Sequence, residues 1–338
     1  MDFADINRWL EQILPDPAIR FEELLECIFC GEWKKIGDVA IQYLLGEIDI
    51  GFQQNKKVFT STFLLLLILS ILLNFADGFH DQQAARIGFF IVYMLLATVC
   101  LREFQIVFWK VEDRLCMLTD FMRIFCPEYF LLVTLSSGGK GLYETILLSI
   151  YLVELIVLKF IFPLIRMDVI VQVMNHLTGG HRLSELESLL RTVICWVLKG
   201  MVGTILGFQT IQSLLSPAMG GLKRGVLKKT MEALPGIGNV FESVADVAFA
   251  ASVVIKNGIG ICGALLLLWI SMTPILQLLI PYFYLRVLAA VLQPISNKRV
   301  IYCIKGISQG YELLFRVLCN VMMLFLITFV ILSATTRG

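Results

Sequence analysis

Long stretches without a charged side chain limit what this chain can fold into more than any other feature. The clearest covers residues 58–75, which follow Lys56 and Lys57 and contain no Asp, Glu, Lys or Arg. A helix rises about 1.5 Å per residue, so this stretch has nearly the length needed to cross the roughly 30 Å hydrocarbon core of a bilayer. It therefore predicts a transmembrane helix.

The composition agrees with a membrane protein. Of 338 residues, 58% are hydrophobic and 16% are charged, and the mean hydropathy is +0.81. Soluble domains are about 45–50% apolar and about 25% charged. A soluble chain of this length would need more charge to cover its core, so lipid must replace much of the polar surface. The net charge of +1 gives no reason to expect a nucleic acid as partner.

The apolar stretches predict an all-α, polytopic helical membrane domain over residues 56–338. About six spans are expected, near 58–75, 87–101, 142–162, 192–215, 258–285 and 313–332. Residues 102–123 alternate charged and apolar side chains and predict an interfacial helix. Residues 125–135 are too short to cross, and residues 216–256 contain a Pro-Gly breaker, so both predict broken or re-entrant segments.

Residues 1–55 predict an amphipathic helical N-terminal region. Three segments, 6–14, 21–29 and 36–44, each place their apolar residues on one stripe of a helix. Such a region suits contact with a membrane or a partner protein, and a compact helical subdomain without a binding role fits equally well. The chain opens without a basic and apolar leader, so a signal sequence either never existed or was removed.

No catalytic motif emerges from the sequence. It contains no HExxH, GxSxG or GxxxxGK[ST] pattern, and its three histidines show no ligand spacing. The nine cysteines are odd in number and irregular in spacing, which argues against a disulfide framework. Cys27 and Cys30 form a lone CxxC, and helix packing explains it better than a metal site. We therefore expect no enzyme activity, no metal and no cofactor.

Glycines in the apolar stretches predict close helix packing. Residues 258–263 match GxGxxG, but they open an apolar helix with no preceding strand, so a dinucleotide site is rejected. Small residues allow helices to approach closely in a membrane. The residues expected to pack closely or to break a helix are Gly200, Gly203, Gly207, Pro235, Gly236, Gly238, Gly258 and Gly260.

Polar residues inside apolar stretches are the candidate functional residues, because charge near the bilayer centre is costly. Glu154 lies near the middle of the third expected span. The full set for a polar pathway or a subunit contact is Glu154, Glu242, Asp246, Lys256, Asn257 and Arg286. Charge pairing that only fixes helix register is the alternative.

Three runs of sequence carry a family resemblance. They are LPGIGNVFES at 234–243, ASVVIKNGIG at 251–260 and AAVLQP at 289–294. In order and spacing they resemble stage III sporulation protein AE, a polytopic membrane protein of endospore-forming bacteria. The resemblance implies a secretion-like complex between mother cell and forespore, with the chain in the mother-cell-derived outer forespore membrane.

The same resemblance implies partners and an orientation. The partners are other stage III membrane proteins of the same operon, including an AA-type ATPase and ring-forming AG-type and AH-type subunits, with stage II protein Q on the forespore side. A homo-oligomer is also possible. The resemblance places residues 1–50 outside the cytoplasm, whereas the excess of Lys and Arg favours a cytoplasmic side at Lys56 and Lys57.

Two other functions fit the sequence less well. A stand-alone secondary transporter of a small solute would use broken helices and a buried acid such as Glu154. An intramembrane enzyme lacks a nucleophile–base pair in the sequence. Replacing the turn with Pro235→Leu and Gly238→Val should abolish assembly or transport if the channel hypothesis is correct.

Overall fold

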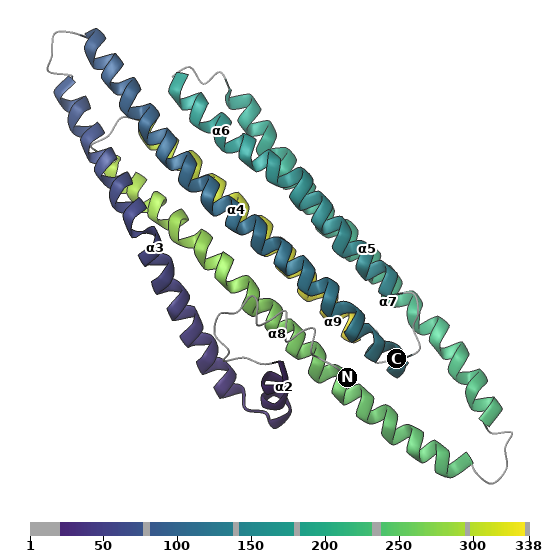
Figure 1. Cartoon of the computed structure of the whole chain (residues 1–338). Coiled ribbons are helices and arrows are strands. Elements are labelled where there is room, and N and C mark those ends of the chain that lie inside the picture. Colours follow the sequence, from purple (N-terminus) through teal and green to yellow (C-terminus); the bar gives the residue numbers. More distant parts are fainter. Residues whose placement is uncertain are drawn as a thin grey trace.

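The protein is a bundle of long helices. The computed structural model describes residues 21–76, 82–137, 142–178, 183–231, 238–294 and 298–334, and every regular element in these ranges is helical. The elements are α2 (Phe21–Cys30), α3 (Trp33–Ala76), α4 (Gln82–Ser137), α5 (Leu142–Glu154), the π-helix η1 (Leu155–Ile161), α6 (Phe162–Thr178), α7 (Ser184–Met231), α8 (Gly238–Leu292) and α9 (Lys298–Ala334). Figure 1 shows the long helices side by side in an elongated bundle. The prediction of an all-α fold is confirmed.

Five helices of the described part are long and apolar enough to cross a membrane. They are Ile87–Pro127, Ile146–Asn175, Ser184–Ile211, Asn257–Leu292 and Lys298–Ile331. Each contains or largely overlaps one of the expected spans, which confirms a polytopic membrane protein. The sixth expected span, residues 58–75, is the C-terminal part of α3, and several of its side chains lie outside the described residues.

Helix α4 corrects the prediction for residues 87–135. The expected span, interfacial helix and short re-entrant segment are one helix of 56 residues that runs through Pro127. A proline inside a helix removes one hydrogen bond, and packing by neighbouring helices makes this tolerable in a membrane protein. At about 1.5 Å per residue, α4 is roughly 84 Å long, far more than one bilayer requires.

The third expected span also continues further than predicted. It was expected to end at residue 162, just before Pro163, but α5, η1 and α6 form one rod from Leu142 to Thr178. Proline cannot donate a hydrogen bond, and its ring crowds the carbonyl four residues earlier. The helix widens to π geometry just before the proline, where the Phe162 N–H donates to the carbonyl of Val157.

The segment expected to be broken at 216–256 is mostly helical. Residues 216–231 extend α7, and residues 238–256 begin α8. Pro235 and Gly236 lie outside the described residues, and Gly238 is the first residue of α8.

The N-terminal helices pack against α8. The Tyr43 and Thr273 hydroxyl oxygens are 2.7 Å apart, and the Tyr43 ring centroid lies 5.0 Å from that of Trp269. Burial raises the pKa of Tyr43 above its usual value. Helix α3 continues across the expected boundary at residues 55 and 56, so the division into two regions remains a prediction. The first amphipathic segment, residues 6–14, lies outside the described residues.

Gly31 makes the turn between α2 and α3 possible, because its φ angle is 72°. A side chain in this left-handed conformation is strained. We therefore expect Gly31→Ala to lower the free energy of unfolding by about 1 kcal/mol, measured as thermal unfolding in detergent. The matched control is Gly37→Ala inside α3, where no atom would meet the new methyl group. That change should be neutral or stabilising, and equal effects at both sites would contradict the role of the turn.

Two glycines bring α8 against the aromatic side chains of α4. A Cβ at Gly260 would lie 2.5 Å from the Tyr129 hydroxyl oxygen, and a Cβ at Gly263 would lie 2.6 Å from Phe125 Cε1. Real Cβ atoms do not approach so closely, so these positions require glycine. The aromatic rings of α4 therefore fill the space next to α8, at the centre of the bundle.

Candidate functional site

A buried polar cluster joins α6, α7 and α9. Asp168 and Gln172 of α6 have no exposed surface, and the Gln172 Nε2 donates to Asp168 Oδ2 over 2.5 Å. Arg191 of α7 places its Nε 3.6 Å from the same carboxylate oxygen and contacts Glu187 at 3.4 Å. Arg191 also donates to the Gln309 side chain of α9. The Arg191 guanidinium thus connects its own helix α7 to α6 and α9.

Two buried oxygen atoms of this cluster accept no hydrogen bond from the described residues. Among the described residues, neither Asp168 Oδ1 nor Gln172 Oε1 has a hydrogen-bond partner. The backbone of α9 comes close at this point, since a Cβ at Gly306 would lie 2.6 Å from Gln172 Oε1. Buried acceptors are costly unless paired, and a water molecule could donate to both. The cluster can therefore bind a small polar molecule, or it can hold the three helices in their relative positions.

Glu154 and Arg286 form separate ion pairs, so the structure does not bring them together. Glu154 pairs with Arg123 of α4. Arg286 lies 3.6 Å from Glu312 of α9 and 5.3 Å from the centroid of the Tyr282 ring. Each pair joins two neighbouring helices, which is the arrangement expected for charges that fix helix register.

The remaining polar candidates lie near the start of α8. Glu242, Asp246 and Lys256 are in the helix, but their side chains lie outside the described residues. Asn257 is half-buried, and within the described ranges its Oδ1 has no hydrogen-bond partner. A polar pathway through these residues remains a prediction.

The candidate packing glycines fall into two groups. Gly258 lies against the Phe29 ring of α2, where a Cβ would be 2.6 Å from Cζ, and Gly260 lies against Tyr129 as described above. Gly200, Gly203 and Gly207 differ, because a Cβ at these positions would have no atom within 4 Å. They lie on the outward side of α7, so the close approach expected for them is not made within the described part of the chain.

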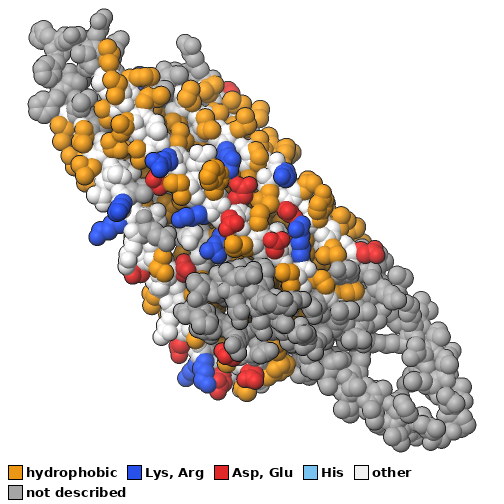
Figure 2. Space-filling view, viewed as in Figure 1, with side chains coloured by type: hydrophobic (Ala, Val, Ile, Leu, Met, Phe, Trp, Pro, Cys, Tyr) orange, Lys and Arg blue, Asp and Glu red, His pale blue; other side chains and the backbone are white. Residues whose placement is uncertain are grey.

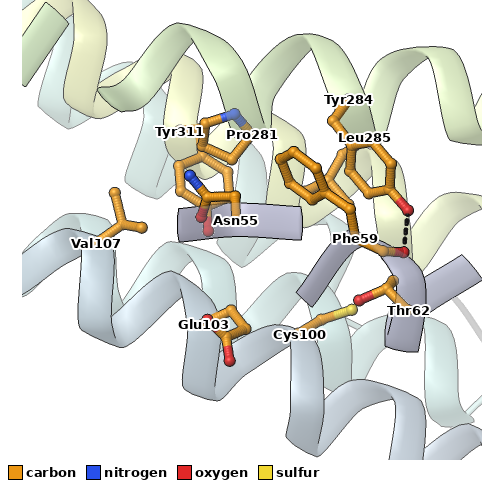
Figure 3. A pocket seen from close by; sticks show the side chains of 10 residues that line it. All are labelled: Asn55, Phe59, Thr62, Cys100, Glu103, Val107, Pro281, Tyr284, Leu285 and Tyr311. Carbon is orange, nitrogen blue, oxygen red and sulfur yellow. Dashed lines mark hydrogen bonds between the residues drawn. The ribbon is translucent and has the colours of Figure 1, made fainter. Parts of the chain in front are cut away.

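A small pocket opens between α3, α4, α8 and α9 (Figure 3). It is lined by Asn55, Phe59, Thr62, Cys100, Glu103, Val107, Pro281, Tyr284, Leu285 and Tyr311. The Tyr284 hydroxyl donates to the carbonyl of Phe59 over 2.6 Å, the dashed line in Figure 3. The cavity volume of about 20 Å³ suits an ordered water molecule and is too small for a solute.

Comparison with known proteins identifies the family. A family model described as "Stage III sporulation protein AE" matches residues 20–336. The chain belongs to this family. The stage III sporulation protein AE of Bacillus subtilis (strain 168) is 25% identical over 305 residues, which cover 89% of this chain and 75% of the relative. No solved structure matches.

Membership of the stage III sporulation protein AE family confirms the resemblance seen in the sequence and gives this membrane protein a role in sporulation. In the described ranges of this family member, no group of three or more His, Cys, Asp or Glu side chains could hold a metal ion. Its polar features are instead ion pairs and hydrogen bonds between helices.

Sequence reasoning missed the polar cluster of this AE-family protein. The third span was expected to end at Pro163, which left Asp168 and Gln172 in a connecting segment. Their spacing was an available signal, since residues i and i+4 share one side of a helix. Asn175 continues the same side and accepts a hydrogen bond from the Leu183 N–H over 3.1 Å. Arg191 and Gln309 could not be found from spacing, because they come from other helices.

Proposed function

We propose that this chain is a non-enzymatic membrane subunit of the channel or secretion-like complex that joins mother cell and forespore. The observation that carries the proposal is the family match over residues 20–336. The proposed partners are the AA-type ATPase, the ring-forming AG-type and AH-type subunits and the other stage III membrane proteins. The proposed location is the mother-cell-derived outer forespore membrane.

The packed interior supports a role as a subunit rather than as a channel on its own. Phe125 of α4 lies 5.2 Å from Phe329 of α9 and 5.8 Å from Tyr129, measured between ring centroids. These rings are fully or almost fully buried. This packing supports a passage that forms between chains rather than within the described part of one chain.

Purification from sporulating cells tests this proposal. The tagged chain, extracted in mild detergent, should carry the other stage III proteins with it, and cells without the chain should fail to form heat-resistant spores. A membrane protein of the same cells with an unrelated role is the control for co-purification. Normal spore counts without the chain, or recovery of the chain alone under several detergents, would contradict the proposal.

The buried cluster around Asp168 favours a second candidate, a stand-alone secondary transporter. Intramembrane acids and irregular helices mark substrate or ion sites in such proteins, and Asp168 lies about two helical turns beyond the end of the π-helix η1. Purified chain in liposomes distinguishes the two functions. Ion-coupled solute flux without any partner, lost in Asp168→Asn, would favour the transporter.

A further inference from the structure

The small pocket in Figure 3 is lined by polar side chains from four helices. Asn55 belongs to α3, Glu103 to α4, Tyr284 to α8 and Tyr311 to α9. Tyr311 is 2% exposed, and Asn55 and Glu103 are half-buried. Polar groups that are wholly or partly removed from water need partners. The chemistry of a bound molecule or ion therefore follows from the hydrogen bonds that these side chains already make.

The hydrogen-bond donors of two of these side chains are already used within the protein. The Asn55 Nδ2 donates to the carbonyl of Gly51 over 2.8 Å, and the Tyr284 hydroxyl donates to the carbonyl of Phe59 over 2.6 Å. A carbonyl only accepts, so the Asn55 nitrogen and the Tyr284 proton are both committed. In Figure 3 the Asn55 amide oxygen lies on the side of Glu103, and its nitrogen points away. Both side chains can therefore offer only acceptors to the pocket.

Glu103 adds a negative charge to these acceptors. None of the ion pairs among the described residues involves Glu103. Lys56, next to Asn55, and Arg102, next to Glu103, are both exposed, and Figure 2 shows basic side chains on the surface across the middle of the molecule. A carboxylate that is partly removed from water without a counter-charge is unfavourable. The pocket therefore favours a positive charge.

A water molecule would meet these requirements only in part. Its two hydrogen atoms can reach two acceptors, and it leaves the charge of Glu103 uncompensated. An unhydrated Na⁺ or K⁺ ion is no larger than a water molecule, so it fits the cavity of about 20 Å³. Such an ion contacts several oxygen atoms at once and balances one carboxylate. Divalent ions fit less well, because Ca²⁺ takes roughly 6–8 oxygen ligands and Mg²⁺ keeps several of its waters.

We propose that this pocket binds one alkali cation, Na⁺ or K⁺, with the Glu103 carboxylate as its counter-charge. The neutral ligands are the Asn55 amide oxygen and the hydroxyl oxygens of Tyr284 and Tyr311. Oxygen ligands suit hard cations, and the site differs from the groups of His, Cys, Asp or Glu that hold other metals, none of which occurs in the described ranges. The bound ion connects α3 to α4, α8 and α9, so it stabilises the docking of α3 on the bundle.

Thermal unfolding of the purified wild-type chain in detergent tests the proposal. The chain is unfolded in NaCl, in KCl and in choline chloride at equal ionic strength. A ligand that binds only the folded state raises the unfolding temperature as its concentration exceeds the dissociation constant. We expect Na⁺ or K⁺, at about ten times its dissociation constant, to raise the unfolding temperature by about 2–4 °C above the value in choline. The response to the two salts identifies the preferred ion.

Glu103→Gln keeps the size of the side chain and removes its charge. This variant should unfold at the same temperature in all three salts, and in choline it should be at least as stable as the wild-type chain, because no uncompensated carboxylate remains. Glu23→Gln is the matched control, since Glu23 is exposed on α2, and it should retain the full response. Asn55→Ala removes one oxygen ligand and should raise the ion concentration that produces half of the shift.

A direct binding measurement on the wild-type chain does not depend on any variant. Radioactive Na⁺, or radioactive Rb⁺ as a substitute for K⁺, should bind at one ion per chain and should be displaced by an excess of the unlabelled ion. Equal unfolding temperatures in the three salts without a bound ion would show that the pocket holds water only. An equal response of Glu103→Gln and the wild-type chain would place the ion elsewhere. Either result would overturn the proposal and leave the proposed function untouched.

Discussion

Gly263→Leu is expected to abolish accumulation of the folded chain in the membrane, and with it the formation of spores, whereas Gly203→Leu should leave both unchanged. A Cβ at Gly263 would meet the Phe125 ring, whereas at Gly203 it would meet no atom within 4 Å. The Phe125 ring cannot easily move, because its centroid lies 5.4 Å from that of Phe121 and 5.2 Å from that of Phe329. Overpacking a filled core by one methyl or methylene group costs about 1–3 kcal/mol, and leucine adds several such groups.

The measurement is the amount of chain in membranes together with its thermal unfolding in detergent. Adding Phe125→Ala to Gly263→Leu should restore part of the lost stability, because the smaller side chain leaves room for the leucine. An unchanged unfolding temperature in Gly263→Leu would show that α4 and α8 do not pack as described.

Arg191→Ala is expected to lower the free energy of unfolding by about 3–5 kcal/mol, the usual cost of breaking a buried ion pair. The change removes the only cation that pairs with Asp168 among the described residues. It also removes the hydrogen bond to Gln309. Asp168 has no exposed surface, so its carboxylate loses a cation without being returned to bulk water.

Arg316→Ala is the matched control. Arg316 pairs with Glu312 at 2.6 Å, but 54% of its side chain is exposed, and such pairs contribute about 1 kcal/mol or less. The double variant Asp168→Ala with Arg191→Ala should be more stable than Arg191→Ala alone, because the buried Asp168 carboxylate is no longer left without a cation. Denaturant unfolding in detergent measures all four proteins, and equal losses for Arg191→Ala and Arg316→Ala would contradict the role of burial.

The sequence predicted the spans well because an uncharged stretch is a local property. Residues 258–285 fall within the candidate span Asn257–Leu292, and residues 313–331 fall within Lys298–Ile331. Helix lengths were predicted less well. The segment around Pro127 was expected to be re-entrant, and the third span was expected to end at residue 162, before Pro163. Both prolines lie in continuous helical rods, because contacts with neighbouring helices outweigh the loss of one backbone hydrogen bond.

The polar contacts were beyond the reach of sequence spacing. Glu154 stood out as an acid in an apolar stretch, but nothing in the chain indicated Arg123 as its partner. Arg286 was a candidate for a polar pathway or a subunit contact, and its partner is Glu312 of the next helix. The partners of a charge in a helical bundle are set by how the helices pack, and that arrangement is a property of the whole fold.

The unbroken course of α3 has a mechanical consequence. Its 44 residues contain no proline, and at about 1.5 Å per residue they form a rod of roughly 66 Å. One end, near Trp33, belongs to the amphipathic part of the chain, and the other end is the apolar stretch before Ala76. A continuous helix transmits a tilt along its whole length. A partner that tilts the first turns of α3 therefore also moves its apolar end within the bilayer.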